Sequence, residues 1–214
     1  MLGVALPLIN VRQEKIAFDD HLKAIPRTMP FAIDLDGQSL RWEQDERALL
    51  VENDEFSWMA DEFPGGIHCR PDGGTQGTWV RLGWAYNRTP EEPAPDPELS
   101  PYFLDIVLRG ASRLNPALAA YIGKLPRKHT HYGGYYTMTE ENWPLIGPMG
   151  ELDGAYMVAG MSGFGTMAAC GVGKLCADWI SGAPLPNYAD ALSVKRYDDL
   201  ALMAELEAGN KGVP

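Results

Sequence analysis

The sequence predicts an α+β fold, in which a mixed and mainly antiparallel sheet is flanked by helices and followed by a strand–glycine loop–helix unit. Three observations support this prediction. Segments of alternating polar and apolar residues follow one another with turn residues between them, whereas a parallel sheet would place helices there. Apolar residues recur at helical spacing between 101 and 114. A compact apolar segment at 155–159 runs into a glycine-rich turn and another helical segment.

The first quarter of the chain contains four candidate strands. Residues 3–9 are apolar enough for a short, largely buried strand. Alternation predicts two more strands at 31–35 and 40–43, joined by a turn at Asp36-Gly37. Residues 48–52 form a further candidate strand.

The middle of the chain predicts one strand and two helices. Turn residues at 65–66 and 71–74 precede a strand at 79–86 that is rich in aromatic side chains. Residues 101–114 predict a helix with one broad apolar face. Asn115-Pro116 is typical of the start of a second helix, with asparagine as the cap and proline at the first helical position.

The last third predicts a buried strand at 155–159, a tight loop at 160–166 and a helix at 167–180. Ser181-Gly182 is a helix stop signal. One amphipathic helix is expected between 193 and 206.

The net charge and the cysteine content indicate which kinds of binding partner are not expected. The 214 residues include 18 lysines and arginines against 29 aspartates and glutamates, a formal net charge of −11. Nucleic acids and anionic membranes attract basic surfaces, so this charge argues against both as partners. No segment predicts a membrane span, and the start lacks the basic region of a signal peptide. The three cysteines fit no metal or redox spacing, so we expect a cytoplasmic protein without a metal site.

The segment from 155 to 180 is the part of the sequence best suited to ligand binding. Gly160, Gly163 and Gly165 allow a sharp turn and a close approach of the backbone to a ligand. N–H groups at the start of the following helix would stabilise an anion or an electron-rich carbonyl. The spacing is not that of the GxGxxG dinucleotide fingerprint. The residues alone leave two interpretations open, a packing turn and a ligand-binding loop.

Two motifs bear on this choice. Residues 131–148, HYGGYYTMTEENWPLIGP, contain a Gly-aromatic segment followed by Pro-Leu-Ile-Gly. Residues 152–167, LDGAYMVAGMSGFGTM, contain a strand and a glycine loop. In this order the motifs resemble the C-terminal signature of the D-amino-acid-oxidase-like FAD oxidoreductases, which include glycine oxidase, sarcosine oxidase and D-amino-acid dehydrogenase. A weaker resemblance at 6–18 and 69–74 extends it over most of the chain.

The resemblance implies FAD as the cofactor. The residues expected to bind it, with Ser162 as a hydrogen-bond donor, are Gly160, Met161, Ser162, Gly163, Phe164, Gly165 and Thr166. The FAD would be non-covalent, because Gly134 stands where sarcosine oxidases carry the linking cysteine. Met167 stands where those enzymes carry the lysine that activates oxygen, which favours a dehydrogenase over an oxidase.

The resemblance also implies a small amino-acid or amine substrate. Tyr136 stands where the family often carries the arginine that holds the substrate carboxylate. The expected substrate-binding residues are Tyr135, Tyr136 and Arg81, with Arg70 as an alternative carboxylate partner. Thr139-Glu140-Glu141 replaces the family's Thr-Pro-Asp-like turn. The resemblance assigns no catalytic residue and no metal ligand, and the histidines are expected to be structural.

The domain organisation follows from the same resemblance. Residues 1–143 would form a substrate-binding domain with a return strand at 3–9, and residues 144–214 a flavin-covering segment from an incomplete FAD domain. Nothing before Leu6 supplies the family's GxGxxG unit, so we expect a fragment or subunit that is completed by a homodimer or an N-terminal partner chain. The isolated chain would then lack FAD if that half is needed to hold it.

The expected function is FAD-dependent oxidation of the C–N bond of an amino acid or N-alkyl glycine, by hydride transfer to the flavin. The alternative is a non-catalytic substrate- or protein-binding module that has lost the FAD domain.

Overall fold

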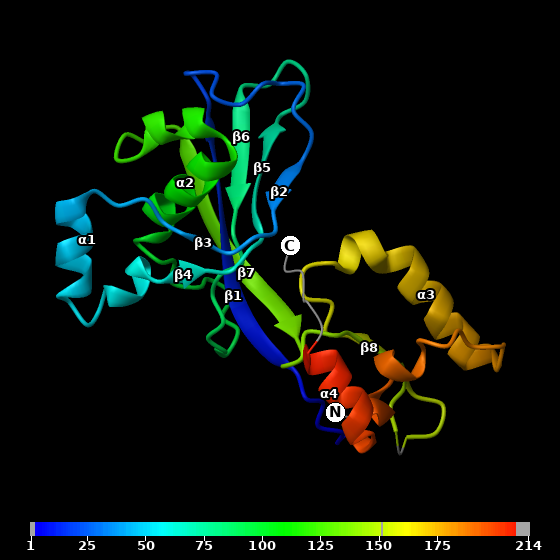
Figure 1. Ribbon diagram of the computed structural model, residues 1–214. Coiled ribbons are helices and arrows are strands. Elements are labelled where there is room, and N and C mark those ends of the chain that lie inside the picture. Colours follow the sequence, from blue (N-terminus) through cyan, green and yellow to red (C-terminus); the bar gives the residue numbers. More distant parts are fainter. Residues whose placement is uncertain (1–2, 151, 209–214) are drawn as a thin grey trace. The chain divides into compact units, whose positions relative to one another are not determined.

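The computed structural model describes residues 3–150 and 152–208, which form two compact units (Figure 1). The sheet unit comprises residues 13–88 and 94–134. The α3 unit comprises residues 3–12, 89–93 and 135–208. The chain last passes between the units at Gly134–Tyr135, before the predicted boundary at 143, and the division into a substrate-binding domain and a flavin-covering segment stays a prediction.

A five-stranded sheet has the order β2–β5–β6–β1–β7 (Figure 1). Its strands are β1 (Ile9–Asp19), β2 (Ala32–Asp34), β5 (Ile67–Asp72), β6 (Trp79–Gly83) and β7 (His129–Met138). β6 pairs antiparallel with β1 and with β5, and β5 pairs antiparallel with β2. The predicted α+β fold with a mainly antiparallel sheet is confirmed. The strand expected at 79–86 is present as β6 but ends at Gly83.

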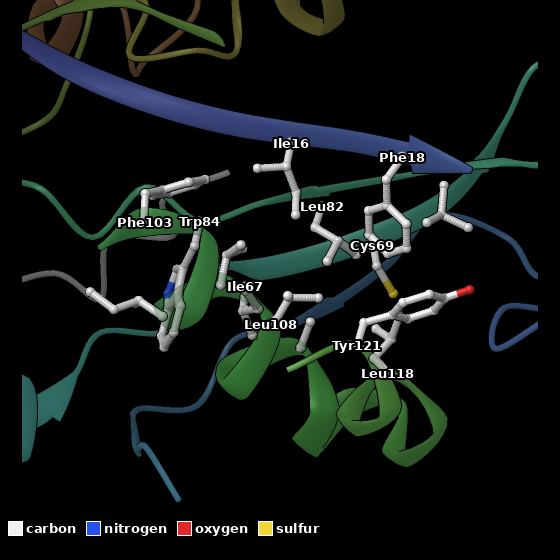
Figure 2. Close-up of a cluster of buried hydrophobic side chains, with 14 of the residues drawn as sticks. Ile16, Phe18, Ile67, Cys69, Leu82, Trp84, Phe103, Leu108, Leu118 and Tyr121 are labelled. Carbon is white, nitrogen blue, oxygen red and sulfur yellow. The ribbon is translucent and has the colours of Figure 1, made fainter. Parts of the chain in front are cut away.

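One face of this sheet forms the main hydrophobic core. Because side chains alternate along a strand, Ile16 and Phe18 of β1 lie on the same face as Leu82 and Val80 of β6, which are their cross-strand partners. All four are buried, and helix α2 (Phe103–Leu114) packs against this cluster (Figure 2). The opposite face of the same strands carries charged side chains.

Helix α2 occupies the segment predicted at 101–114. Phe103, Ile106 and Val107 are buried at the helical spacing that the sequence shows. After the helix, Asn115 Oδ1 accepts a hydrogen bond from the N–H of Ala117 (3.3 Å). The 3-10 helix η2 (Pro116–Tyr121) therefore begins where Asn115-Pro116 predicted a helix start.

Two of the early strand predictions require correction in position or pairing. The strand expected at 3–9 begins at its last residue, since β1 starts at Ile9 and residues 3–8 have no regular structure. The expected hairpin between 31–35 and 40–43 is wrong, and residues 40–43 form no strand. β2 pairs with β5, while β3 (Gln38–Ser39) pairs with β4 (Glu62–Phe63). In this pairing Gly37 lies against β4, where an added Cβ would be 2.2 Å from Glu62 Oε1 and 3.4 Å from the Phe63 carbonyl oxygen.

The strand predicted at 48–52 is also wrong, because this segment belongs to helix α1 (Gln44–Val51). Glu43 and Glu46 form a capping box, in which Glu46 accepts a hydrogen bond from the N–H of Glu43 (2.9 Å). Leu49 and Val51 are 69% and 57% exposed, so no buried sheet face selects an extended strand here. The 3-10 helix η1 (Ser57–Ala60) follows.

The α3 unit contains an antiparallel pair of strands, β8 (Leu145–Pro148) and β9 (Tyr156–Ala159), followed by helix α3 (Gly165–Ser181). Gly182 ends the helix with a left-handed φ of 68°. The strand, the glycine loop and the helix are therefore confirmed as elements. A small apolar cluster around Leu175 joins α3 to β8.

The tail contains η3 (Asp190–Leu192), η4 (Val194–Asp198) and helix α4 (Leu200–Ala208). The single helix expected at 193–206 is divided at Asp199. Asp199 Oδ1 accepts hydrogen bonds from the N–H groups of Ala201 (3.1 Å) and Leu202 (3.0 Å), so this residue caps α4. In the part of the chain that the structure describes, no helix combines the length and apolarity needed to cross a membrane.

Candidate functional site

Residues 160–166 connect β9 to α3 through the backbone conformations that their glycines predict. Gly160 and Gly163 have φ angles of 69° and 91°. Ser162 between them has a φ of 47°, which is unfavourable for a residue with a side chain. Its N–H donates to the Thr137 carbonyl (3.1 Å) and its hydroxyl to the Gly160 carbonyl (3.4 Å). The Ser162 side chain is thus buried and holds the turn together from inside.

Tyr136 of β7 lies directly against this loop. A Cβ atom added to Gly163 would lie 2.6 Å from Cε2 and Cζ of Tyr136 and 2.9 Å from its hydroxyl oxygen. These distances are far shorter than van der Waals contact, so only glycine fits where the ring approaches. The structure therefore brings Tyr136 together with the loop. Tyr135 is next to it on β7, and alternation directs its side chain to the other face of the strand.

The first turn of α3 presents N–H groups that no side chain caps. The Phe164 N–H donates to the Met161 carbonyl (2.7 Å), and the Ala168 N–H donates to the Phe164 carbonyl (2.9 Å). The N–H groups between them, from Gly165 to Met167, form the partially positive end of the helix. Thr166 and Met167 are exposed, so this end is open to an anionic or carbonyl ligand.

A buried arginine supports the segment next to the loop. The Arg196 side chain is 0% exposed and forms an ion pair with Glu141, which is 4% exposed. Its guanidinium also donates to the Pro144 carbonyl (2.7 Å). Gly160 of the loop lies beside this segment, where an added Cβ would be 3.5 Å from Thr139 Cγ2 and 3.7 Å from Pro144 Cα. The ion pair thus fixes the wall against which the loop packs.

The protonation states of this cluster follow from its contacts. Burial raises the pKa of Glu141, but hydrogen bonds from the backbone, Tyr197 and Arg196 outweigh burial, so this pKa lies below its ordinary value of 4.5. Burial and the hydrogen bond to Glu141 raise the pKa of Tyr197 to about 12. Sequence reasoning missed Arg196, which lies 55 residues from its partner. The sequence did hold one sign of this ion pair, because Glu141 stands where the Thr-Pro-Asp-like turn of the family has its acidic residue.

Arg81, the third predicted substrate ligand, lies on β6 in the sheet unit. Its guanidinium donates to Asp72 Oδ2 at 2.6 Å. Arg70, the alternative carboxylate partner, lies on β5 with a guanidinium nitrogen 3.6 Å from Asp72 Oδ1. Both arginines therefore share one carboxylate within the protein.

The histidines make structural contacts. Burial lowers the pKa of His68 to about 4, so this imidazole is neutral at physiological pH. His131 Nε2 lies 2.6 Å from Glu14 Oε2, and His129 Nδ1 lies 2.7 Å from the Pro126 carbonyl oxygen. Within residues 3–150 and 152–208, His, Cys, Asp and Glu side chains form no group of three or more that is arranged to hold a metal ion.

Comparison with known proteins identifies the family of the chain and its fold. Residues 20–179 match the family described as FAD dependent oxidoreductase. Glycine oxidase from Geobacillus kaustophilus has a similar fold, with 17% sequence identity over 91% of this chain and 40% of that chain, and a TM-score of 0.56. L-proline dehydrogenase from P. horikoshii is 21% identical over 92% of this chain and 42% of that chain, with a TM-score of 0.61. This chain therefore spans about two fifths of the length of the solved structures that it resembles.

Proposed function

This chain belongs to the family of FAD-dependent oxidoreductases, and from that premise we propose that it is the flavin-covering and substrate-binding part of an enzyme that oxidises the C–N bond of an amino acid or N-alkyl glycine. The contact of Tyr136 with the 160–166 loop, at the uncapped start of α3, carries the proposal. This contact supports the proposal because it places a proposed substrate ligand beside the proposed flavin-binding loop, and a substrate that gives up a hydride must lie next to the flavin.

The loop fits a flavin in its backbone geometry and in its open hydrogen-bond donors. Gly163 presents a bare backbone, and the N–H groups from Gly165 to Met167 would hold the pyrimidine edge non-covalently. Phe164 and Met167, which are 36% and 71% exposed, supply apolar surface beside those donors. Bound FAD would supply the two-electron acceptor for a hydride from the substrate carbon.

The proposed substrate ligands are Tyr135, Tyr136 and Arg81. Tyrosine hydroxyls donate neutral hydrogen bonds to a carboxylate, whereas an arginine donates charge-assisted ones. The names of the two structural neighbours, a glycine oxidase and an L-proline dehydrogenase, support a small amino acid as the substrate. Met167, in place of the oxygen-activating lysine, supports a dehydrogenase that passes electrons to an acceptor other than oxygen.

We also propose that the enzyme acts in the cytoplasm and that a second chain, in a homodimer or as an N-terminal partner, completes it. Helix α3 supports a partner because Met167 and Ile180 are 71% and 59% exposed, and burial of such apolar side chains stabilises association.

The visible absorption spectrum of the purified chain, after incubation with excess FAD and removal of unbound cofactor, tests the proposal. We expect retained flavin bands that glycine, L-proline, sarcosine or a D-amino acid bleaches under anaerobic conditions. Gly163→Ala should abolish retention, because its Cβ would lie 2.6 Å from the Tyr136 ring. Gly154→Ala is the matched control, since its φ of 73° is similarly left-handed but its Cβ would meet nothing within 4 Å.

Equal flavin retention by both variants would contradict the role of the loop. Retention of FAD without bleaching by any of these substrates would contradict C–N oxidation. If the wild-type chain binds no FAD even in excess, this chain is at most half of a flavin site, and the second chain that we propose has to supply the other half. The alternative of a non-catalytic substrate- or protein-binding module takes the place of this proposal if the complex with such a chain also retains no flavin.

A further inference from the structure

The face of the five-stranded sheet opposite the core carries a row of cations on three neighbouring strands. Lys15 of β1, Arg81 of β6 and Arg70 of β5 alternate with core-facing residues and therefore point to this face, where Lys15 is half-buried and the side chains of Arg81 and Arg70 are 37% and 39% exposed. Arg70 and Arg81 are direct cross-strand partners. Lys15 is paired with Gly83, where an added Cβ would lie 3.2 Å from Lys15 Cγ. Because residue 83 is a glycine, the aliphatic part of the Lys15 side chain can lie over it.

The positive charge of this row exceeds the negative charge beside it. Asp72 is the carboxylate that both arginines approach, at 2.6 Å from Arg81 and 3.6 Å from Arg70. Lys15 makes no hydrogen bond or ion pair with the residues that the structure describes. Arg81 Nε is buried without a hydrogen-bond partner in the same described part of the chain. Three cations therefore share one anion.

The surroundings do not compensate this excess. His68 on the same face is neutral at physiological pH, since burial lowers its pKa to about 4. At the Trp79 end of the row, Asp19 and Lys128 carry opposite charges. Burial is the largest cause that lowers the pKa of Lys15, and the positive charges of Arg81 and Arg70 lower it further. An added anion would relieve this repulsion.

We propose that Lys15, Arg70 and Arg81 bind a small dicarboxylate on the face of the sheet opposite the core. Guanidinium groups hold carboxylates through paired donors, and a lysine ammonium acts as a point charge. Lys15 lies two strand residues from the arginine pair, about 7 Å along the sheet. One carboxylate would lie at Lys15 and the other at the two arginines.

This site extends the proposed role of Arg81 and yet needs no flavin, because all three cations belong to the sheet unit. Its test is therefore carried out without FAD, so that failure of the flavin proposal and failure of the anion site are separate outcomes.

Isothermal titration calorimetry of the full chain with succinate, at constant ionic strength, tests the site. We expect one-site binding, with butyrate at least about tenfold weaker because it offers one carboxylate. Lys15→Gln and Arg70→Gln should each weaken succinate binding at least about tenfold, and Asp72→Asn should strengthen it by removing the competing carboxylate. Lys124→Gln, which removes an exposed lysine outside the row, should leave binding unchanged.

Thermal melting without ligand establishes that each variant is folded. Because the Arg70 side chain is 39% exposed, Arg70→Gln should not disturb the packing of the core. Absence of succinate binding by the wild-type chain would overturn the proposal, as would unchanged binding in both Lys15→Gln and Arg70→Gln. Inorganic phosphate that binds as tightly as succinate, with the same dependence on Lys15, would overturn it in favour of a phosphate site.

Discussion

The sheet unit and the α3 unit are stabilised in different ways. In the sheet unit, the largest fully buried side chains are aromatic and aliphatic, among them Trp84, Phe18 and Phe103, and they form one core (Figure 2). In the described part of the α3 unit, the largest fully buried side chain is Arg196. The stability of a hydrophobic core comes from many small packing contacts, whereas loss of either partner of a buried ion pair leaves an uncompensated buried charge and is strongly destabilising.

The main helices of the two units differ in how many of their residues are buried. Helix α2 buries seven of its 12 residues, and six of these seven are apolar or glycine. Helix α3 has 17 residues, of which Leu175 is buried. Packing thus constrains the side chains of α2, while α3 keeps small and apolar residues on a surface that is open to a ligand or a partner. Four predictions follow from this difference between the units.

The largest effect is expected from the loss of Arg196. Arg196→Met leaves the Glu141 carboxylate buried without its cation, which should lower the free energy of unfolding by about 3–5 kcal/mol in urea denaturation. Adding Glu141→Leu should restore most of this loss, because an apolar pair can replace a buried ion pair. Lys195→Gln, at an exposed neighbouring cation, should change stability by less than about 0.5 kcal/mol.

The same pair predicts a dependence on pH. Because folding lowers the pKa of Glu141, the ion pair stabilises the fold above the ordinary value of 4.5 and loses this contribution as the pH falls through the lowered pKa. Arg196→Met should show a smaller loss in acid, because the hydrogen bonds from the backbone and Tyr197 remain. If the variant is as stable as Lys195→Gln at neutral pH, the α3 unit does not depend on the ion pair.

A smaller effect is expected from Gly110→Ala in α2. The new Cβ would lie 2.3 Å from Cζ3 of Trp84, a buried ring whose Nε1–H donates to the Pro64 carbonyl (2.9 Å). Overpacking should cost about 1–3 kcal/mol and outweigh the higher helix propensity of alanine, about 1 kcal/mol. Urea denaturation measures the net loss. A gain in stability would contradict this prediction and would mean that the core around Trp84 repacks to accommodate an added methyl group.

The smallest effect, of opposite sign, is expected from Gly171→Ala in α3. An added Cβ at this position meets nothing within 4 Å, so the substitution should stabilise the helix by about 0.5–1 kcal/mol. Gly173→Ala, equally open, should behave in the same way. The melting temperature, measured at two protein concentrations, checks this. A loss of stability that grows with concentration would indicate that a second copy of the chain packs closely against α3.

Local signals account for the parts of the fold that could be predicted. The helix at 101–114 follows from apolar periodicity, and the end of α3 follows from Gly182, whose left-handed conformation suits glycine. Residues 48–52 were misassigned because a short apolar run fits a strand as well as a helix, although the capping box at Glu43 and Glu46 was a readable local signal. The pairing of β3 with β4 depends on contacts far apart in sequence, which local patterns do not encode.

The sequence by itself determined the family, the class of the fold, the glycine loop and the two main helices, because periodicity, glycine positions and short motifs act within a few residues. The tertiary structure alone decided which charges meet. Arg196 finds Glu141, and Lys15 comes to lie near Arg70 and Arg81, only through chain packing and strand register. The energy of a charge depends on its distance to other charges and on its burial, and both are properties of the folded chain.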